Sequence, residues 1–164
     1  MTRILSRVSL ETSQELYVRK IKDGTVIDHI TSGFALDVLK ILGIDGKDGE
    51  AVTAAMNVAS KRQSYKDILK IQNRELKPAE VDKIALIAPK ATINIIRNYS
   101  VASKKLVELP TVIKGIVKCD NPSCISNSRE PVDPKFEVDR REPVRLRCSY
   151  CGHVIEREDI LKQF

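Results

Sequence analysis

The chain of 164 residues contains no tryptophan and only four tyrosines and three phenylalanines. Proteins that bind single-stranded nucleic acid stack bases on aromatic side chains, so this scarcity argues against that class. The sequence also lacks a run of about 18 to 20 apolar residues, which argues against a membrane-spanning helix. Its first twenty positions scatter charged residues and contain no apolar block typical of a secretory signal. We therefore expect a cytoplasmic protein that does not interact with membranes.

The common catalytic motifs are absent as well. The sequence has no P-loop, no G-x-G-x-x-G and no G-x-S-x-G, and it contains only two histidines, His29 and His153. A lone histidine within an apolar segment, such as His29, is more often a packed residue than a general base. We expect a non-enzymatic protein, with a cysteine-nucleophile enzyme as an alternative that thiol alkylation would test.

Four cysteines form the most informative pattern, a C-x4-C pair followed after 23 residues by a C-x2-C pair. Zinc prefers tetrahedral ligation, and each short pair lets one tight turn supply two sulfurs. Four thiolates leave no open coordination position, so we expect one structural zinc ion, with His153 outside the ligand set. Free cysteines and an iron site are the alternatives. The expected ligands are Cys119, Cys124, Cys148 and Cys151.

Positive charge is distributed unevenly along the chain, whose net charge is +6. Residues 1–109 carry 18 lysines and arginines against 13 acidic residues, whereas residues 110–164 carry 10 against 9. Four zinc-bound thiolates would make the second region negative, which is unfavourable for a nucleic-acid-binding finger. A zinc-ribbon nucleic-acid-binding protein nevertheless remains the alternative, because four arginines lie near the second cysteine pair: Arg140, Arg141, Arg145 and Arg147.

Hydrophobic periodicity predicts an α+β fold. The expected order is strand, helix, strand, strand, helix, strand, as in a ferredoxin-like two-layer sandwich with an antiparallel sheet and two helices. The first strand covers residues 16–30 with an interruption at Gly24, and Ser32 is expected to cap the first helix. The remaining elements are expected at residues 34–42, 51–59, 65–71, 78–88 and 91–97, with an added edge strand at 98–106.

A change in composition near Pro110 predicts a domain boundary. Residues 1–109 form the sandwich, and residues 110–164 form a small all-β, rubredoxin-like zinc domain. In the first domain, several lysines fall on or beside strands. Either a solvated face or a phosphate site explains them, since ammonium groups on a rigid sheet suit a polyphosphate. These residues are Lys66, Lys70, Lys104 and Lys105.

Three segments coincide with one known family: residues 24–30 (GTVIDHI), residues 88–99 (beginning APKATIN) and residues 119–125 (CDNPSCI). Across residues 17–160 the chain resembles the regulatory subunit of aspartate carbamoyltransferase, an enzyme of pyrimidine biosynthesis. The resemblance implies a non-catalytic chain whose N-terminal domain binds CTP, ATP and other nucleoside triphosphates as allosteric effectors. It also implies that the zinc domain docks on the catalytic chain and that regulatory chains associate as dimers.

The same resemblance assigns roles to individual positions. Lys70 and Lys104 match lysines that contact the nucleotide, and Lys66 lies near it. Asp28 and His29 match the pair that flanks ribose and phosphate, and Asn94 matches a polar residue near the phosphates. Positions that line the base and sugar pocket are matched by Val18, Ile21, Ile96, Tyr99 and Val101.

Overall fold

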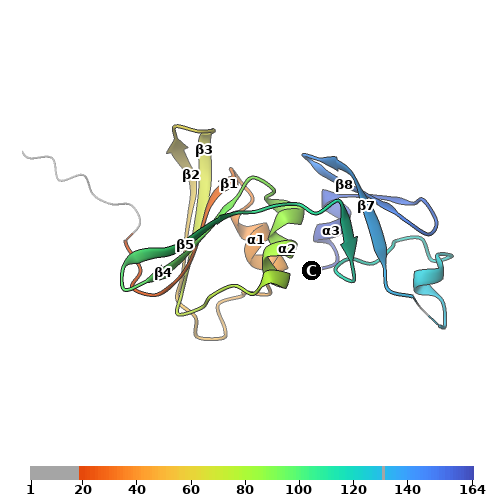
Figure 1. Ribbon diagram of the computed structural model, residues 1–164, viewed down its shortest axis with the longest axis horizontal. Helices are drawn as coiled ribbons and strands as arrows, with labels where there is room; N and C mark the ends of the chain where they lie inside the picture. Colours follow the sequence, from red (N-terminus) through yellow and green to blue (C-terminus); the bar gives the residue numbers. More distant parts are fainter. Residues whose placement is uncertain (1–18, 131) are drawn as a thin grey trace, which may run out of the picture.

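The computed structural model describes residues 19–130 and 132–164 and arranges them in two β-containing units (Figure 1). The N-terminal unit holds a five-stranded antiparallel sheet in the order β2-β3-β1-β4-β5. Its strands are β1 (Gly24–Thr31), β2 (Val52–Ser60), β3 (Ser64–Gln72), β4 (Thr92–Arg97) and β5 (Ser100–Leu106). Without β5, the chain order and the strand order are those of a ferredoxin-like sandwich, which confirms the predicted fold class.

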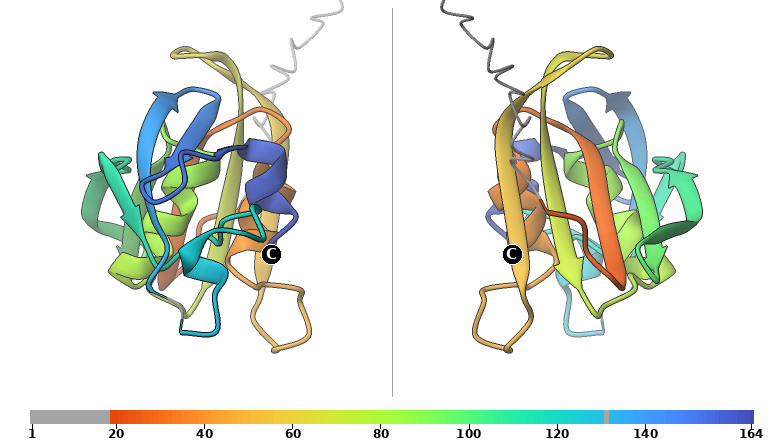
Figure 2. Two further views of the ribbon diagram at one scale, coloured as in Figure 1. Left: turned by 90° about the vertical axis from the view of Figure 1, so that its right-hand side faces the viewer. Right: turned by 90° about the vertical axis from the view of Figure 1, so that its left-hand side faces the viewer.

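Two helices, α1 (Ala35–Ile41) and α2 (Pro78–Ile87), cover one face of this sheet. Side chains alternate along a strand, so Leu69 and Ile71 of β3 point to the helices and are fully buried. Lys66 and Lys70 share the opposite face. Figure 2 shows this outer face uncovered by any helix of the described residues.

The C-terminal unit is a small four-stranded antiparallel sheet in the order β6-β7-β8-β9. Its elements are β6 (Val112–Lys114), the 3₁₀ turn η1 (Ile125–Asn127), β7 (Lys135–Arg141), β8 (Val144–Cys148), β9 (Val154–Glu156) and helix α3 (Arg157–Leu161). Phe136, Leu146 and Ile155 are fully buried and form its centre. The expected small β domain is therefore present.

The two helices of the first unit lie between its sheet and the C-terminal unit, and α3 packs against them (Figure 1). Lys40 of α1 donates from Nζ to the backbone oxygen of Leu161 at 2.8 Å. The guanidinium of Arg157 lies 4.5 Å from the centre of the Phe34 ring, in a cation–π contact. These contacts join the two units through the helix layer rather than through the open sheet face.

Two local expectations were wrong. Residues 19–21, the described part of the first predicted strand segment, are not in a strand. The backbone oxygen of Lys22 instead accepts from the N–H of Tyr99 at 2.8 Å. Ser32 does not cap α1, because its hydroxyl donates to the side chain of Asn57, and the first residue of α1 is capped by Asp67. None of the helices in the described ranges has the length and apolarity needed to cross a membrane.

Candidate functional site

The four cysteine sulfurs lie within 4.8 Å of one another. The Sγ atoms of Cys119 and Cys151 are 3.6 Å apart, and those of Cys124 and Cys148 are 3.7 Å apart. Four sulfurs about 2.3 Å from a central zinc ion stand about 3.8 Å from each other in a tetrahedron. The donor set and its spacing therefore fit one tetrahedral zinc ion.

Tight turns in two loops deliver these sulfurs. The N–H of Ser123 donates to Oδ1 of Asn121 at 3.0 Å, which closes a side-chain turn between the first two cysteines. In the second loop, the N–H of Gly152 donates to the backbone oxygen of Cys148 at 2.9 Å. Gly152 has a φ of 74°, a conformation that glycine adopts without steric cost. The predicted ligand spacing thus corresponds to two compact turns facing each other.

The environment of the thiols is divided between burial and hydrogen bonding. Burial raises the pKa of Cys119 and, less strongly, the pKa of Cys148. A backbone N–H at His153 lowers the pKa of Cys151 to about 6, and the hydroxyl of Ser126, 3.2 Å from Sγ of Cys124, lowers the pKa of that thiol. Hydrogen bonding therefore favours the thiolate forms of Cys151 and Cys124, whereas burial disfavours those of Cys119 and Cys148, where a bound cation would offset the cost.

A second group of predicted residues forms a row across the outer face of the five-stranded sheet. Val26 at the centre pairs with Lys70 on one side and with Asn94 on the other, and Asn94 pairs with Lys104. Residues directly opposite in neighbouring strands project from the same face. The register thus places two ammonium groups and one carboxamide on a single solvent-facing surface, built from β3, β4 and β5.

Next to this row, Asp28, His29 and Lys66 form a contact cluster. Nζ of Lys66 lies 2.7 Å from Oδ1 of Asp28, and Nδ1 of His29 lies 3.6 Å from the other oxygen of that carboxylate. Burial lowers the pKa of His29. The carboxylate of Asp28 raises this pKa, and nearby cations including Lys66 and Lys104 lower it further. Burial likewise lowers the pKa of Lys70, whose Nζ donates to the backbone oxygen of Arg19 at 2.6 Å. The cluster is a crowded cationic surface with a single carboxylate inside it.

The apolar members of the predicted set lie toward one end of the same sheet. Ile96 pairs with Val101 across β4 and β5, and Tyr99 occupies the two-residue turn that joins these strands. Asn98 and Tyr99 both have positive φ, 49° and 63°, as a type I′ hairpin turn requires. Ile21 is buried, whereas Tyr99 and Val101 are exposed. Val18 lies outside the described residues.

Several residues that support these sites were not anticipated. Asp67 is a fully buried acid on β3, and Gln63 donates from its side chain to the backbone oxygens of His29 and Ile30. Ser126 donates to a cysteine sulfur. The only sequence signal for Asp67 was an acid at a position where strand alternation calls for an apolar side chain.

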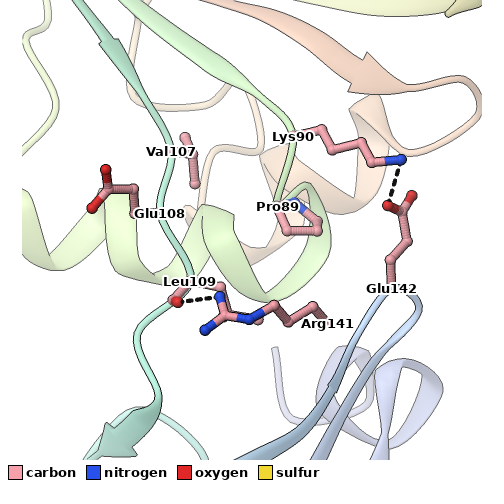
Figure 3. A pocket seen from close by; sticks show the side chains of 7 residues that line it. All are labelled: Pro89, Lys90, Val107, Glu108, Leu109, Arg141 and Glu142. Carbon is pink, nitrogen blue, oxygen red and sulfur yellow. Dashed lines mark hydrogen bonds and ion pairs between the residues drawn. The ribbon is translucent and has the colours of Figure 1, made fainter.

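The junction between the two units carries a hollow of about 470 Å³ beside the linker (Figure 3). On one side, Lys90 reaches Glu142 at the tip of the β7–β8 hairpin, with Nζ 2.7 Å from Oε2. On the other, Arg141 donates from Nη1 to the backbone oxygen of Leu109 at 2.7 Å. These two polar contacts tie the hairpin to the N-terminal unit.

The arginines that suggested nucleic acid binding are engaged within the chain. Arg145 and Arg147 both contact the carboxylate of Asp139, and Arg140 lies 3.9 Å from Glu156. Together with the Arg141 contact at the junction, these pairings account for all four arginines. These four cations face two carboxylates and the backbone oxygen of Leu109, so part of their charge is neutralised within the chain.

Comparisons with known proteins agree across nearly the whole chain. Residues 16–108 match the family described as aspartate carbamoyltransferase regulatory chain, allosteric domain, and residues 111–161 match its metal binding domain. The chain is 52% identical over 155 residues to the aspartate carbamoyltransferase regulatory chain of Hyperthermus butylicus, covering 94% of this chain and 97% of that one. It is 59% identical over 138 residues to that of Methanothrix thermoacetophila, covering 84% and 90%.

These matches decide between the open alternatives. The metal binding domain coincides with the cysteine cluster, so the four sulfurs hold one metal ion, and their donor set is that of a structural zinc site. The matched descriptions do not favour a nucleic-acid-binding ribbon. The chain belongs to the family of aspartate carbamoyltransferase regulatory chains, the non-catalytic subunits of that enzyme.

Proposed function

We propose that the outer face of the five-stranded sheet binds CTP, ATP and other nucleoside triphosphates as allosteric effectors of aspartate carbamoyltransferase. The observation that carries the proposal is the row of Lys70, Asn94 and Lys104 on an open sheet face. A triphosphate needs several fixed cations within one compact area, and point charges on neighbouring strands meet this requirement.

Within this surface, Lys70 and Lys104 contact the nucleotide, and Lys66 lies near it. Asp28 and His29 flank ribose and phosphate, and Asn94 lies near the phosphates. The reduced pKa of Lys70 supports a phosphate site, because a bound polyanion stabilises the charged form of a partly desolvated ammonium group. Binding of the triphosphate should therefore offset the free-energy cost of keeping Lys70 charged in its partly buried position.

The base and sugar would lie toward the turn between β4 and β5, against Ile21, Ile96, Tyr99 and Val101. Val18, predicted for the same pocket, lies outside the described residues. The N–H of Tyr99 already donates to Lys22, so the contact that we propose here uses the carbonyl of Tyr99. A carbonyl accepts from the exocyclic amino group that cytosine and adenine both carry. The position of that amino group differs between the two bases and gives the site a basis for discrimination.

The two units of the chain have different proposed roles. We assign effector binding to residues 1–109 and docking on the catalytic chain, the partner implied by the family, to residues 110–164. Regulatory chains would associate as dimers through their nucleotide domains, in the cytoplasm. Zinc would act only structurally, because four thiolates leave no position for a substrate.

Coupling between the sites would operate through the packing of α1 and α2 against α3. An effector biases the assembly only if it binds two arrangements of the chains with unequal affinity. The helices lie between the effector face and the C-terminal domain, so a change in sheet geometry would reach the docking domain through them (Figure 1).

Calorimetric titration of the full chain with CTP and ATP tests the proposal. Lys104→Ala should weaken binding about tenfold or more, since hydrogen bonds to charged groups contribute about 1.5–3 kcal/mol each. Lys105→Ala is the matched control, because Lys105 follows on the same strand and pairs with buried Ile93 on the other face. Equal losses in both variants, or unchanged affinity in Lys104→Ala, would contradict the proposed site.

A further inference from the structure

Asp67 is an acid with no exposed surface in the middle of β3, directly after Lys66. Its Oδ2 accepts from the N–H of Gly33 at 2.8 Å and from the N–H of Ala35 at 3.0 Å. Its Oδ1 accepts from the N–H of Asn57 at 2.8 Å. Burying a carboxylate is costly, and these three backbone donors compensate for the lost water.

The donors come from the two strands that flank β3 or from the segment directly after one of them. The register of β2 against β3 shifts between Ala55 and Val58, and Asn57 has a φ of 57° in this bulge. The register of β1 against β3 shifts between Ile27 and Ile30, with His29 at a φ of 58°. One carboxylate therefore lies between two bulges on opposite sides of its own strand.

The β1 bulge holds two residues of the effector face. A non-glycine residue at positive φ carries a conformational cost that surrounding contacts must offset. The chain leaving the bulge is fixed at Gly33 and Ala35 by Asp67, and its carbonyls at His29 and Ile30 are held by Gln63. The directions of the Asp28 and His29 side chains depend on this bulge.

We propose that Asp67 is a positioning residue of the effector site, which fixes the β1 bulge so that Asp28 and His29 face Lys66. It does not touch the effector face itself, because its side chain points to the helix side of the sheet. This inference rests on the proposed function only where it predicts nucleotide affinity. Its geometric part concerns the β1 bulge, is read out through His29, and stands independently.

Asp67→Asn is the sharpest variant because it preserves size and removes one acceptor. The amide nitrogen would face a backbone N–H, so at least one of the three hydrogen bonds must break. We expect CTP affinity to fall about tenfold at a temperature well below the unfolding transition, since small misplacements of contact groups have effects of this order. Isothermal calorimetry of the full, metal-loaded chain measures the change.

The two histidines provide a second readout. In the ¹H–¹³C spectrum of the imidazole groups, Asp67→Asn should shift the signal and the titration midpoint of His29 and leave the position of the His153 signal unchanged. Ile84→Val is the control, because Ile84 is a fully buried residue of α2 that takes part in none of the hydrogen bonds described at the two bulges. It should lower the unfolding temperature and leave both the His29 signal and the CTP affinity as in the wild type.

The outcomes separate the two proposals. A wild-type chain that binds neither CTP nor ATP would overturn the proposed function, whereas the His29 signal would still decide the role of Asp67. An unchanged His29 signal in Asp67→Asn would overturn the positioning role. If CTP affinity falls equally in Asp67→Asn and Ile84→Val, the effect is one of general stability and the inference fails.

Discussion

The N-terminal sheet domain and the C-terminal cysteine domain differ in how they are stabilised. Of the twelve largest fully buried side chains, eight lie in the N-terminal domain and four in the C-terminal domain. The first domain buries a full layer between sheet and helices, whereas the second, about half as long, buries a smaller apolar centre in proportion to its length. The metal centre adds to this smaller core, so the chain contains one domain held by apolar burial and one held by apolar burial together with coordination bonds.

The largest effect should come from removing a sulfur. Cys148→Ser takes away one of four ligands, and structural zinc sites in small domains supply about 10–16 kcal/mol of folding free energy. We expect the C-terminal domain to unfold and association with the catalytic chain to be lost, while amide signals of the five-stranded sheet persist. Metal analysis, two-dimensional NMR and co-purification check this, with the exposed Ser149→Ala as the control. Retention of one equivalent of zinc would contradict it.

A core substitution in the other domain should show the reverse pattern. Leu86→Ala on α2 removes a fully buried side chain and should cost about 2–5 kcal/mol of unfolding free energy. Denaturant unfolding of the sheet domain measures the loss, and bound zinc should remain at one equivalent. If the variant released its metal before the sheet unfolded, the two domains would not be stabilised separately.

Acid should weaken the N-terminal domain through Glu80. Burial raises the pKa of Glu80, but the N–H of Lys77 and the guanidinium of Arg74 outweigh it and hold this pKa below its usual 4.5. Because the folded-state pKa is depressed, the contribution is complete above the unfolded-state value and is lost as pH falls through the folded-state value. Glu80→Gln should cost about 1.5–3 kcal/mol at pH 7, a magnitude typical of hydrogen bonds to charged groups.

The difference between wild type and Glu80→Gln should shrink as the pH falls below about 4. Denaturant unfolding at several pH values gives this difference, and effects common to both proteins, such as acid release of the metal, cancel. A difference that stays constant down to pH 3 would mean that Glu80 does not contribute through its charge.

The smallest effect concerns the ion pair between the domains. Lys90 is largely exposed, so its pairing with Glu142 should contribute less than about 1 kcal/mol. A double-mutant cycle with Lys90→Ala and Glu142→Ala measures the coupling energy, which should vanish in 1 M salt (Figure 3). A coupling well above this value would show that the hairpin contact, and not only the helix layer, joins the domains.

The sequence predicted those parts of the structure that depend on periodicity and spacing. Hydrophobic periodicity predicted the order of strands and helices along the chain, and the spacing of Cys119, Cys124, Cys148 and Cys151 predicted a cluster that the fold brings together. The edge strand expected near residues 98–106 is β5. These features depend on residue patterns within short stretches of the chain, and such patterns can be read from a single sequence.

The parts that sequence analysis missed depend on contacts between distant residues. Ser32 has the right residue type for a cap, but the N-terminal turn of α1 is capped by Asp67, 35 positions later. Helix α3 is only five residues long and packs on other helices, so its own periodicity carries little information. The bulges at His29 and Asn57 leave no pattern in composition, because they follow from how neighbouring strands are anchored.

The cysteine cluster is not enclosed equally on all sides. Three of its residues are buried, whereas Cys151 is exposed. A chelator or an oxidant can therefore approach the metal at one vertex of the tetrahedron without prior unfolding of the domain. A surface that covers Cys151 would shield the most accessible of the four thiolates that would hold the ion, and so would slow metal exchange without adding a ligand.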